Sequence, residues 1–416
     1  MSNLASGRNI ISCIDIGTTK VCCFIATTDE NRSLKIIGAA YHRASGMQGG
    51  QVVNIPELEN TVRIAVEAAE KMAGTQIEGV FINVACGNPS STDLEMDLKI
   101  SGHQVKDTDV KHLTDHAVEH CDFSERELIH FMPTNYSLDG LNGIIDPRGM
   151  FGNTLGINIH LITAEKRPNQ NLSNAVERCD LSITGKVVSA YASGISCLAD
   201  DEKELGVIII DMGAGTTSIA IFQNGHIKYN HIIPVGGEHV TNDIAKGLAT
   251  PIHRAERLKT MYGSVVPTNS DGGEILRVPI IGEEDDNSVN EIPKSMLVQI
   301  IQPRLEETFE LVRECVNHSS YGKVVGRRVV LTGGASQLEG VRDLAELVLD
   351  KKVRLSRPKP ILGVPESLSG PAFSTATGLL RYAVNDHVTR PSHSKNSNKA
   401  SKYKLHNIKD WFRKNF

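Results

Sequence analysis

The 416-residue sequence contains no long hydrophobic run. Its longest purely aliphatic stretch, Val207–Ile210, is far shorter than the ~20 apolar residues that a transmembrane helix requires. Residues 1–9 contain no hydrophobic stretch that would resemble a secretion signal. The sequence therefore predicts a cytoplasmic protein rather than one that is secreted or spans a membrane.

Metal-site patterns of the zinc type are also missing. The eight cysteines form no close C-x-x-C pair, and most lie inside apolar, strand-like segments, which favours buried thiols in a reducing compartment. Histidines gather in one segment, where His112 and His116 have the i, i+4 spacing of some metal sites. No carboxylate or third ligand is compellingly placed to complete a site with this pair. We therefore interpret the group as ordinary surface residues: His103, His112, His116 and His120.

Positive charge is concentrated at the end of the chain. The formal net charge is −5, and residues 386–416, with eight basic and two acidic residues, contribute +6, which leaves −11 for the rest. An acidic body argues against nucleic-acid binding, whereas a short basic tail favours contact with an anionic partner. The hydrophobic content of 40% and the charged content of 22% are those of a soluble globular protein. At this length we expect about three folding units.

Two segments repeat one pattern 196 residues apart. In residues 14–26 and 210–222, an apolar run ends in an aspartate, a turn of Gly and Thr follows, and a second apolar run begins. Each segment predicts a β-hairpin with Asp15 or Asp211 at the end of its first strand. The N–H groups and hydroxyls of such a turn can hold phosphate, Lys20 adds a positive charge, and the two aspartates can hold hydrated Mg²⁺. One such turn is often purely structural, but two copies with their aspartates in register favour a site that binds phosphate and Mg²⁺.

The remaining segments alternate between strands and helices, which predicts an α/β architecture with buried sheets. Residues 88–161 interrupt this alternation and indicate an inserted subdomain, and residues 385–403, rich in Ser, Asn and Lys, indicate a flexible linker. Helices are expected over residues 56–72, 108–121, 171–179, 294–317 and 338–349, and strands over 80–86, 94–100, 157–162 and 329–331.

The two hairpins resemble the phosphate loops of the superfamily of actin, DnaK-type chaperones and sugar kinases. Residues 331–336 resemble its adenosine loop, residues 255–259 its ribose-binding segment, and residues 234–238 the turn after the second phosphate loop. The resemblance implies ATP and Mg²⁺ as cofactors, metal binding by Asp15 and Asp211, and a catalytic position for Asp211. It implies nucleotide contacts from Gly17, Thr18, Thr19, Lys20, Gly213, Gly215, Thr216, Thr217, Gly237, Glu256, Lys259, Gly333, Gly334 and Ala335. Taken alone, Glu256 and Lys259 fit an ordinary i, i+3 surface ion pair better than a ribose contact.

Over nearly the whole chain the sequence is similar to the FtsA family, the actin-like cell-division proteins of bacteria. Short segments similar to those of the family occur at residues 46–53, 175–179, 204–207, 335–340 and 374–380. The resemblance implies a two-lobed actin-like ATPase fold with an inserted 1C-type subdomain. We therefore assign residues 1–87 and 162–200 to the first lobe (1A), 88–161 to subdomain 1C, 201–239 and 326–384 to the second lobe (2A), 240–325 to subdomain 2B, 385–403 to the linker and 404–416 to a C-terminal amphipathic helix.

The amphipathic helix predicted at the C-terminus has an apolar stripe and a basic surround. About twelve residues span ~18 Å, too short to cross a ~30 Å hydrocarbon core, but such a helix can lie in the membrane interface. Anionic lipid is the expected surface for this tail, and a helix that docks on the protein's own surface is the alternative. The predicted membrane contacts are Leu405, Ile408, Trp411, Phe412, Arg413, Lys414 and Phe416.

For function, the resemblance implies a protein that polymerises with itself on the cytoplasmic side of the inner membrane, as a peripheral protein at the division site. It would anchor the FtsZ ring there by binding the FtsZ C-terminal tail on subdomain 2B, and recruit later divisome proteins through subdomain 1C. Arg304 is a candidate contact for the acidic tail, although it equally fits a solvated helix face. No nucleic-acid partner is expected.

Hydrolysis of ATP is expected to be slow at most. Where DnaK-type relatives carry a carboxylate before Pro, this chain has Ser189 and Ala190, so nucleotide would act mainly as a conformational switch. A sugar or glycerol kinase and an FtsA-like pilus-assembly ATPase share the ATP motifs and remain the alternatives. A DnaK-type chaperone would need a peptide-binding domain after the second lobe, where only about 30 residues remain.

Overall fold

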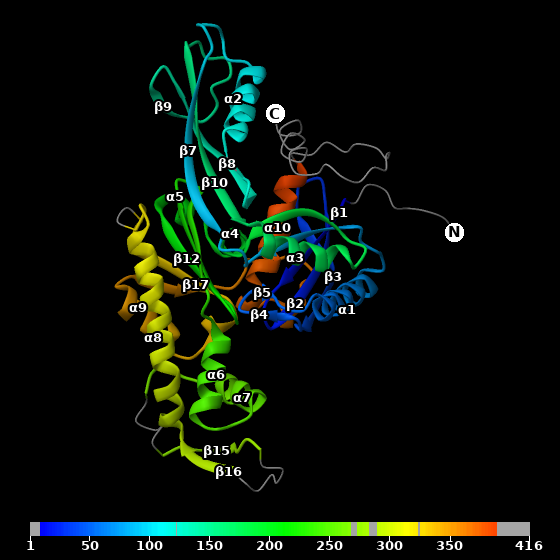
Figure 1. The fold of residues 1–416 in the computed structure, drawn as a ribbon, viewed down its shortest axis with the longest axis vertical. Coiled ribbons are helices and arrows are strands. Elements are labelled where there is room, and N and C mark those ends of the chain that lie inside the picture. Colours follow the sequence, from blue (N-terminus) through cyan, green and yellow to red (C-terminus); the bar gives the residue numbers. More distant parts are fainter. Residues whose placement is uncertain (1–8, 122, 268–272, 283–288, 323–324, 389–416) are drawn as a thin grey trace, which may run out of the picture.

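The computed structural model describes residues 9–121, 123–267, 273–282, 289–322 and 325–388. Two lobes stand beside each other, each built on a five-stranded sheet (Figure 1). The described parts of residues 90–165 and of residues 237–293 extend towards opposite ends of the long axis. The α/β fold class predicted from the alternation of strands and helices is therefore confirmed.

The sheet of the first lobe has the strand order β11-β6-β1-β2-β3. β1 and β2 form the predicted hairpin, with Asp15 opposite Cys22, and β6 pairs in parallel with β1. Helices α1 and α3 cover one face and α10 covers the other, so the central strands are buried on both sides. The bounds are Asn9–Ile16 (β1), Lys20–Thr28 (β2), Leu34–Arg43 (β3), Ile55–Ala73 (α1), Gly79–Val84 (β6), Lys166–Glu177 (α3), Ser182–Val188 (β11) and Ser374–Val388 (α10).

The second lobe repeats this arrangement in the order β14-β13-β12-β17-β18. β12 and β13 form the second predicted hairpin, with Asp211 opposite Ser218, and β17 pairs in parallel with β12. The long helix α8 and α9 cover one face, and the short helix α4 covers the other. The bounds are Ser189–Cys197 (α4), Asp200–Leu205 (α5), Val207–Met212 (β12), Thr217–Gln223 (β13), His226–Ile233 (β14), Lys294–His318 (α8), Arg328–Thr332 (β17), Val341–Leu349 (α9) and Lys352–Leu355 (β18).

Helices α4 and α10 cross between the two lobes (Figure 1). A Cβ atom added to Gly378 of α10 would lie 1.8 Å from the carbonyl oxygen of Ala192 on α4. Backbone therefore packs directly on backbone at this crossing, and only glycine permits that approach.

The expected inserted subdomain is a four-stranded antiparallel sheet in the order β7-β10-β8-β9, with α2 packed on one face. The second extension carries α6, α7 and a two-stranded sheet of β15 and β16 beside the start of α8 (Figure 1). The bounds are Ser90–Lys99 (β7), Asp107–Glu119 (α2), Arg126–Leu138 (β8), Leu141–Ile144 (β9), Thr154–Glu165 (β10), Gly237–Gly247 (α6), Ile252–Tyr262 (α7), Ile275–Pro279 (β15) and Val289–Pro293 (β16).

Local signals explain which predicted boundaries agree with the structure. α1 begins after Asn54, whose side chain accepts the N–H of Glu57, and it ends at Gly74 with a left-handed φ of 68°. α9 begins at Val341 rather than at residue 338, because Gly340 takes a φ of 76° after a 3-10 turn. α3 begins at Lys166 rather than at residue 171.

The C-terminal predictions fall largely beyond the described residues. α10 runs to Val388, so residues 385–388 are helical rather than linker. The rest of the linker and the amphipathic helix, with all seven predicted membrane contacts, lie outside the part of the chain that the structure describes. Within that part, no helix is both long and apolar enough to cross a membrane.

Candidate nucleotide-binding site

The tips of the two predicted phosphate loops meet between the lobes. A Cβ atom added to Gly215 in the second loop would lie 2.3 Å from the hydroxyl oxygen of Thr18 in the first. The same Thr18 oxygen accepts the N–H of Gly50 at 3.0 Å, and a Cβ on Gly50 would lie 2.9 Å from the methyl carbon of Thr216. The turn of β4 (Met47–Gln48) and β5 (Gln51–Val52) therefore belongs to the site, although its residues had not been expected there.

Both candidate metal-binding carboxylates are buried at this junction. Burial raises the pKa of the Asp15 carboxyl to about 6; Lys20 opposes the rise and the nearby Asp211 adds to it. Burial also raises the pKa of Asp211, against hydrogen bonds from two hydroxyls and the charge of Lys20. Two buried carboxylates, of which Asp211 raises the pKa of Asp15, are suited to a divalent cation.

The donor set fits Mg²⁺ rather than a metal with many protein ligands. No group of three or more His, Cys, Asp or Glu suited to a metal ion occurs in the described ranges. Mg²⁺ is usually held by one or two carboxylates together with waters and substrate phosphates. Asp15 and Asp211 would supply the carboxylates for such an ion, and the adjoining loops would supply N–H groups and hydroxyls for a phosphate.

Asp211 has its own hydrogen-bond partners, which the sequence did not reveal. Its Oδ2 accepts bonds from the Ser193 hydroxyl on α4 at 2.5 Å and from the Thr375 hydroxyl on α10 at 2.9 Å. On the other side, Gly333 takes a φ of 89°, and a Cβ atom there would lie 2.4 Å from Asp211 Oδ1. The predicted adenosine loop therefore packs directly on the predicted metal ligand.

Lys20 is turned towards the segment before α10. Its ammonium donates a hydrogen bond to the Ala372 carbonyl and lies 3.7 Å from the ring centroid of Phe373. Its charge remains close enough to Asp15 and Asp211 to oppose the rise that burial causes in the pKa of each carboxyl.

The predicted nucleoside contacts converge on the start of α6. Lys259 Nζ donates to the Gly237 carbonyl at 2.9 Å and to Thr241 Oγ1 at 2.7 Å, and it pairs with Glu256 Oε2 at 2.7 Å. A Cβ on Gly237 would lie 3.0 Å from the Ala335 Cβ. The i, i+3 ion pair therefore exists, but it also joins α7 to the turn beside the adenosine loop. Thr241 is a member that the sequence motif did not indicate.

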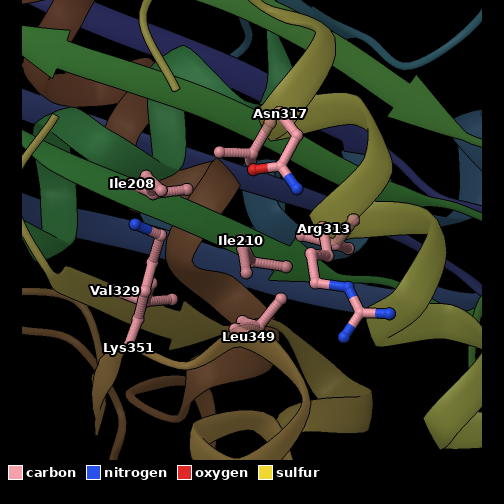
Figure 2. A pocket seen from close by; sticks show the side chains of 9 residues that line it. Ile208, Ile210, Arg313, Asn317, Val329, Leu349 and Lys351 are labelled. Carbon is pink, nitrogen blue, oxygen red and sulfur yellow. The ribbon is translucent and has the colours of Figure 1, made fainter. Parts of the chain in front are cut away.

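A small hollow in the second lobe is separate from the candidate nucleotide site. It lies between α8, β12 and β17, and Figure 2 shows Ile208, Ile210 and Leu349 around it. Its volume of about 20 Å³ corresponds to roughly one water molecule. Because side chains alternate along a strand, Ile208 and Ile210 point to the face of β12 opposite to Asp211.

The predicted partner residue, Arg304, is paired within the chain. Its guanidinium makes two hydrogen bonds to Asp243 on α6, at 2.6 and 3.2 Å, and a further one to Glu307. The side chain is 26% exposed. Any acidic peptide that used Arg304 would therefore compete with Asp243.

Comparison with known proteins identifies the family. A sequence model described as "Cell division protein FtsA" matches residues 208–378, and one described as "SHS2 domain inserted in FTSA" matches residues 87–163. The chain is 40% identical over 384 residues to the cell division protein FtsA of Rhizobium meliloti (strain 1021), covering 90% of this chain and 87% of that protein. It is 32% identical over 423 residues to the FtsA of Pseudomonas aeruginosa, covering 100% of both chains.

Solved structures with low sequence identity share the fold. The PilM-PilN type IV pilus biogenesis complex matches with a TM-score of 0.62 at 16% identity, over 90% of this chain and 98% of that chain. MreB 5 of Spiroplasma citri bound to AMPPNP matches with a TM-score of 0.55 at 13% identity, over 91% of this chain and 98% of that chain. These likenesses confirm the predicted actin-like fold.

Proposed function

The chain belongs to the FtsA family of cell division proteins, and we propose that it serves in division as an ATP-dependent, self-associating membrane anchor for FtsZ. The role in cell division follows from relatives that match it over nearly their full length. The observation that supports nucleotide binding best is the meeting of two hairpin tips, Thr18 and Gly215, each beside a buried aspartate. A fold neighbour, MreB 5, was solved with AMPPNP bound.

In this proposal the two loops bind the phosphates through N–H groups and hydroxyls. Asp15 and Asp211 hold Mg²⁺, which neutralises the phosphate charge and offsets the burial of the two carboxylates. Glu256 and Lys259 contact the ribose, and Gly333 and Gly334 let the adenosine approach the backbone. Because no carboxylate other than the two metal ligands has been assigned to orient an attacking water, hydrolysis is slow and the nucleotide acts as a switch between lobe arrangements.

Membrane attachment depends on the amphipathic tail and on self-association. Burial of five apolar side chains contributes on the order of 5–10 kcal/mol, and ordering about twelve residues costs a comparable amount. A single tail therefore binds weakly, whereas many tails on one polymer bind tightly through their effective concentration. FtsZ would be bound through subdomain 2B near Arg304, and later division proteins through subdomain 1C.

Co-sedimentation with phosphatidylglycerol vesicles tests this function. We would compare the full chain with its Phe412→Glu variant, which places a charge in the apolar stripe, and with His406→Glu, which places the same charge on the opposite side of the predicted helix. We expect Mg-ATP to increase sedimentation of the full chain and of His406→Glu, and Phe412→Glu to stay in the supernatant. If Phe412→Glu sediments as much as the full chain and Mg-ATP changes the sedimentation of neither, the proposal is wrong.

The kinase and pilus-assembly alternatives have weaker support. The likeness to the pilus complex reaches only 16% identity and concerns the fold. The relatives at 30–40% identity that match over most of their length are cell division proteins.

A further inference from the structure

We infer that Ser193 and Thr375 are positioning residues that hold the Asp211 carboxylate for the metal and tie it to the two helices between the lobes. The inference rests on the proposed binding of Mg-nucleotide. Both hydroxyls are buried, and both lie within hydrogen-bond distance of one oxygen, Asp211 Oδ2, at 2.5 and 2.9 Å. The two hydroxyl oxygens are themselves 2.9 Å apart.

This arrangement divides the roles of the two carboxylate oxygens. A hydroxyl has one proton to donate, so Ser193 and Thr375 together give Oδ2 up to two charge-assisted hydrogen bonds. No described residue donates a hydrogen bond to Oδ1, which lies against the Gly333 turn. Oδ1 is therefore the oxygen left to bind a hydrated cation, and Oδ2 is the oxygen that fixes the orientation of the group.

The two donors come from separate helices that meet at the crossing of the lobes (Figure 1). Ser193 follows Ala192, whose carbonyl packs against Gly378 of α10. α10 packs on the sheet of the first lobe, whereas Asp211 lies one residue before the end of β12 in the second lobe. A rotation of the lobes about this crossing would change the Thr375 hydrogen bond, because it joins α10, which packs on the first lobe, to a strand of the second lobe.

A polar seam continues beyond these three residues. The Ser196 hydroxyl donates to the Ser374 carbonyl at 2.8 Å, and the hydroxyls of Ser374 and Thr332 are 2.6 Å apart. Thr332 ends β17, next to the Gly333 turn. Hydroxyl groups therefore link the crossing of α4 and α10 to the ends of β12 and β17, the two strands of the second lobe that border the site. Coupling between sites is reciprocal, so the lobe arrangement and the affinity for Mg-nucleotide should affect each other.

Titration calorimetry on the full chain tests this inference. Thr375→Val keeps the shape of the side chain and removes the donor, and Thr375→Ser keeps the donor. We expect Thr375→Val to weaken Mg-ATP binding about 10-fold, the loss expected for a hydrogen bond to a charged group, and Thr375→Ser to stay within about twofold of the wild type. ATP in EDTA should bind Thr375→Val and the wild type equally, because without Mg²⁺ the orientation of Asp211 is not used. Ser193→Ala should behave as Thr375→Val does.

A double-mutant cycle with Asp211→Asn separates positioning from structure. In that background we expect Thr375→Val to cause no further loss, because the charged acceptor is gone. Equal affinities of Thr375→Val and Thr375→Ser for Mg-ATP, or equal losses with and without Mg²⁺, would overturn the inference while leaving nucleotide binding intact. A wild-type chain that binds no Mg-ATP would instead overturn the proposed function, and this inference with it.

Discussion

The Tyr321 hydroxyl donates a hydrogen bond to the Asp93 carboxylate, which joins the segment after α8 in the second lobe to β7 of the inserted subdomain. The other oxygen of Asp93 lies 2.6 Å from Nδ1 of the buried His160. On its other side the same subdomain is bound to the first lobe, where Glu127 pairs with Lys186 at 2.9 Å. The inserted subdomain therefore contacts both lobes, and a change in the lobe angle must act on one of these contacts.

Removing the Tyr321 hydroxyl should loosen the inserted subdomain from the second lobe. A hydrogen bond of this kind is worth about 1 kcal/mol, so Tyr321→Phe should speed amide hydrogen exchange in the β7 and β10 peptides by about fivefold. Tyr41→Phe, which removes the hydroxyl of an exposed tyrosine on β3, is the control and should change nothing. Unchanged exchange in Tyr321→Phe would show that the contact carries no stability.

Acidification should destabilise the base of the inserted subdomain through His130. Burial, with a smaller effect of His160, lowers the pKa of His130 to about 3, and its Nε2 accepts the N–H of Val188 at the end of β11. The rings of Tyr191 and Tyr382 pack against it. Because the folded pKa lies below the unfolded value of ~6.5, this stability is complete above pH ~6.5 and is lost as the pH falls towards 3.

His130→Gln keeps an acceptor but cannot be protonated in this range. In the wild type, His130 should make the unfolding free energy fall by up to ~1.4 kcal/mol per pH unit between pH 6.5 and pH 3. We expect His130→Gln to lack this contribution to the pH dependence. Chemical denaturation at several pH values measures the slope. The exposed His253, replaced by Gln, is the matched control. If both variants keep the wild-type slope, His130 does not titrate on unfolding as described.

A methyl group at the crossing of α4 and α10 should be costly. In Gly378→Ala the new Cβ would lie 1.8 Å from the Ala192 carbonyl oxygen, so the helices must separate. We expect a loss of about 3 kcal/mol in unfolding free energy. We also expect weaker Mg-ATP binding, because residues of the two crossing helices hydrogen-bond to Asp211. In Gly370→Ala the new Cβ has no neighbour within 4 Å, and stability should change by less than about 0.5 kcal/mol. Thermal and urea denaturation of the two variants give the comparison, and equal stabilities would contradict it.

Arg304 can be tested as an FtsZ contact by releasing it from its internal partner. Asp243→Asn keeps the hydrogen-bonding shape of Asp243 but removes its charge, so the guanidinium becomes more available to an acidic peptide. If Arg304 binds the FtsZ tail, Asp243→Asn should tighten binding of an acidic tail peptide several-fold, and Arg304→Ala should weaken it about 10-fold. Fluorescence anisotropy of the labelled peptide gives both constants. Equal weakening in the two variants would assign the pair a structural role only.

Local features of the chain were readable from the residues alone. Each hairpin carries its own turn of Gly and Thr and its own terminal Asp, so the pairing of β1 with β2 and of β12 with β13 follows from neighbouring residues. The cap at Asn54 and the left-handed Gly74 are equally local, and the expected helix over residues 56–72 corresponds closely to α1 (Ile55–Ala73). The alternation of strands and helices predicted the α/β class and the insertion at residues 88–161, whereas the actin-like fold was implied by the resemblance of the motifs to known families.

Contacts between distant segments were decided by packing, which no local pattern records. Ser193 and Thr375 are 182 residues apart and meet at Asp211 only because α4 and α10 cross there. Asp243 and Arg304 pair across 61 residues, so an arginine that suited an open binding surface is already engaged. The sequence by itself determines the chemistry of each side chain and its local neighbours. Which distant residue becomes its hydrogen-bond or ion-pair partner depends on how helices and sheets bury their apolar faces against one another.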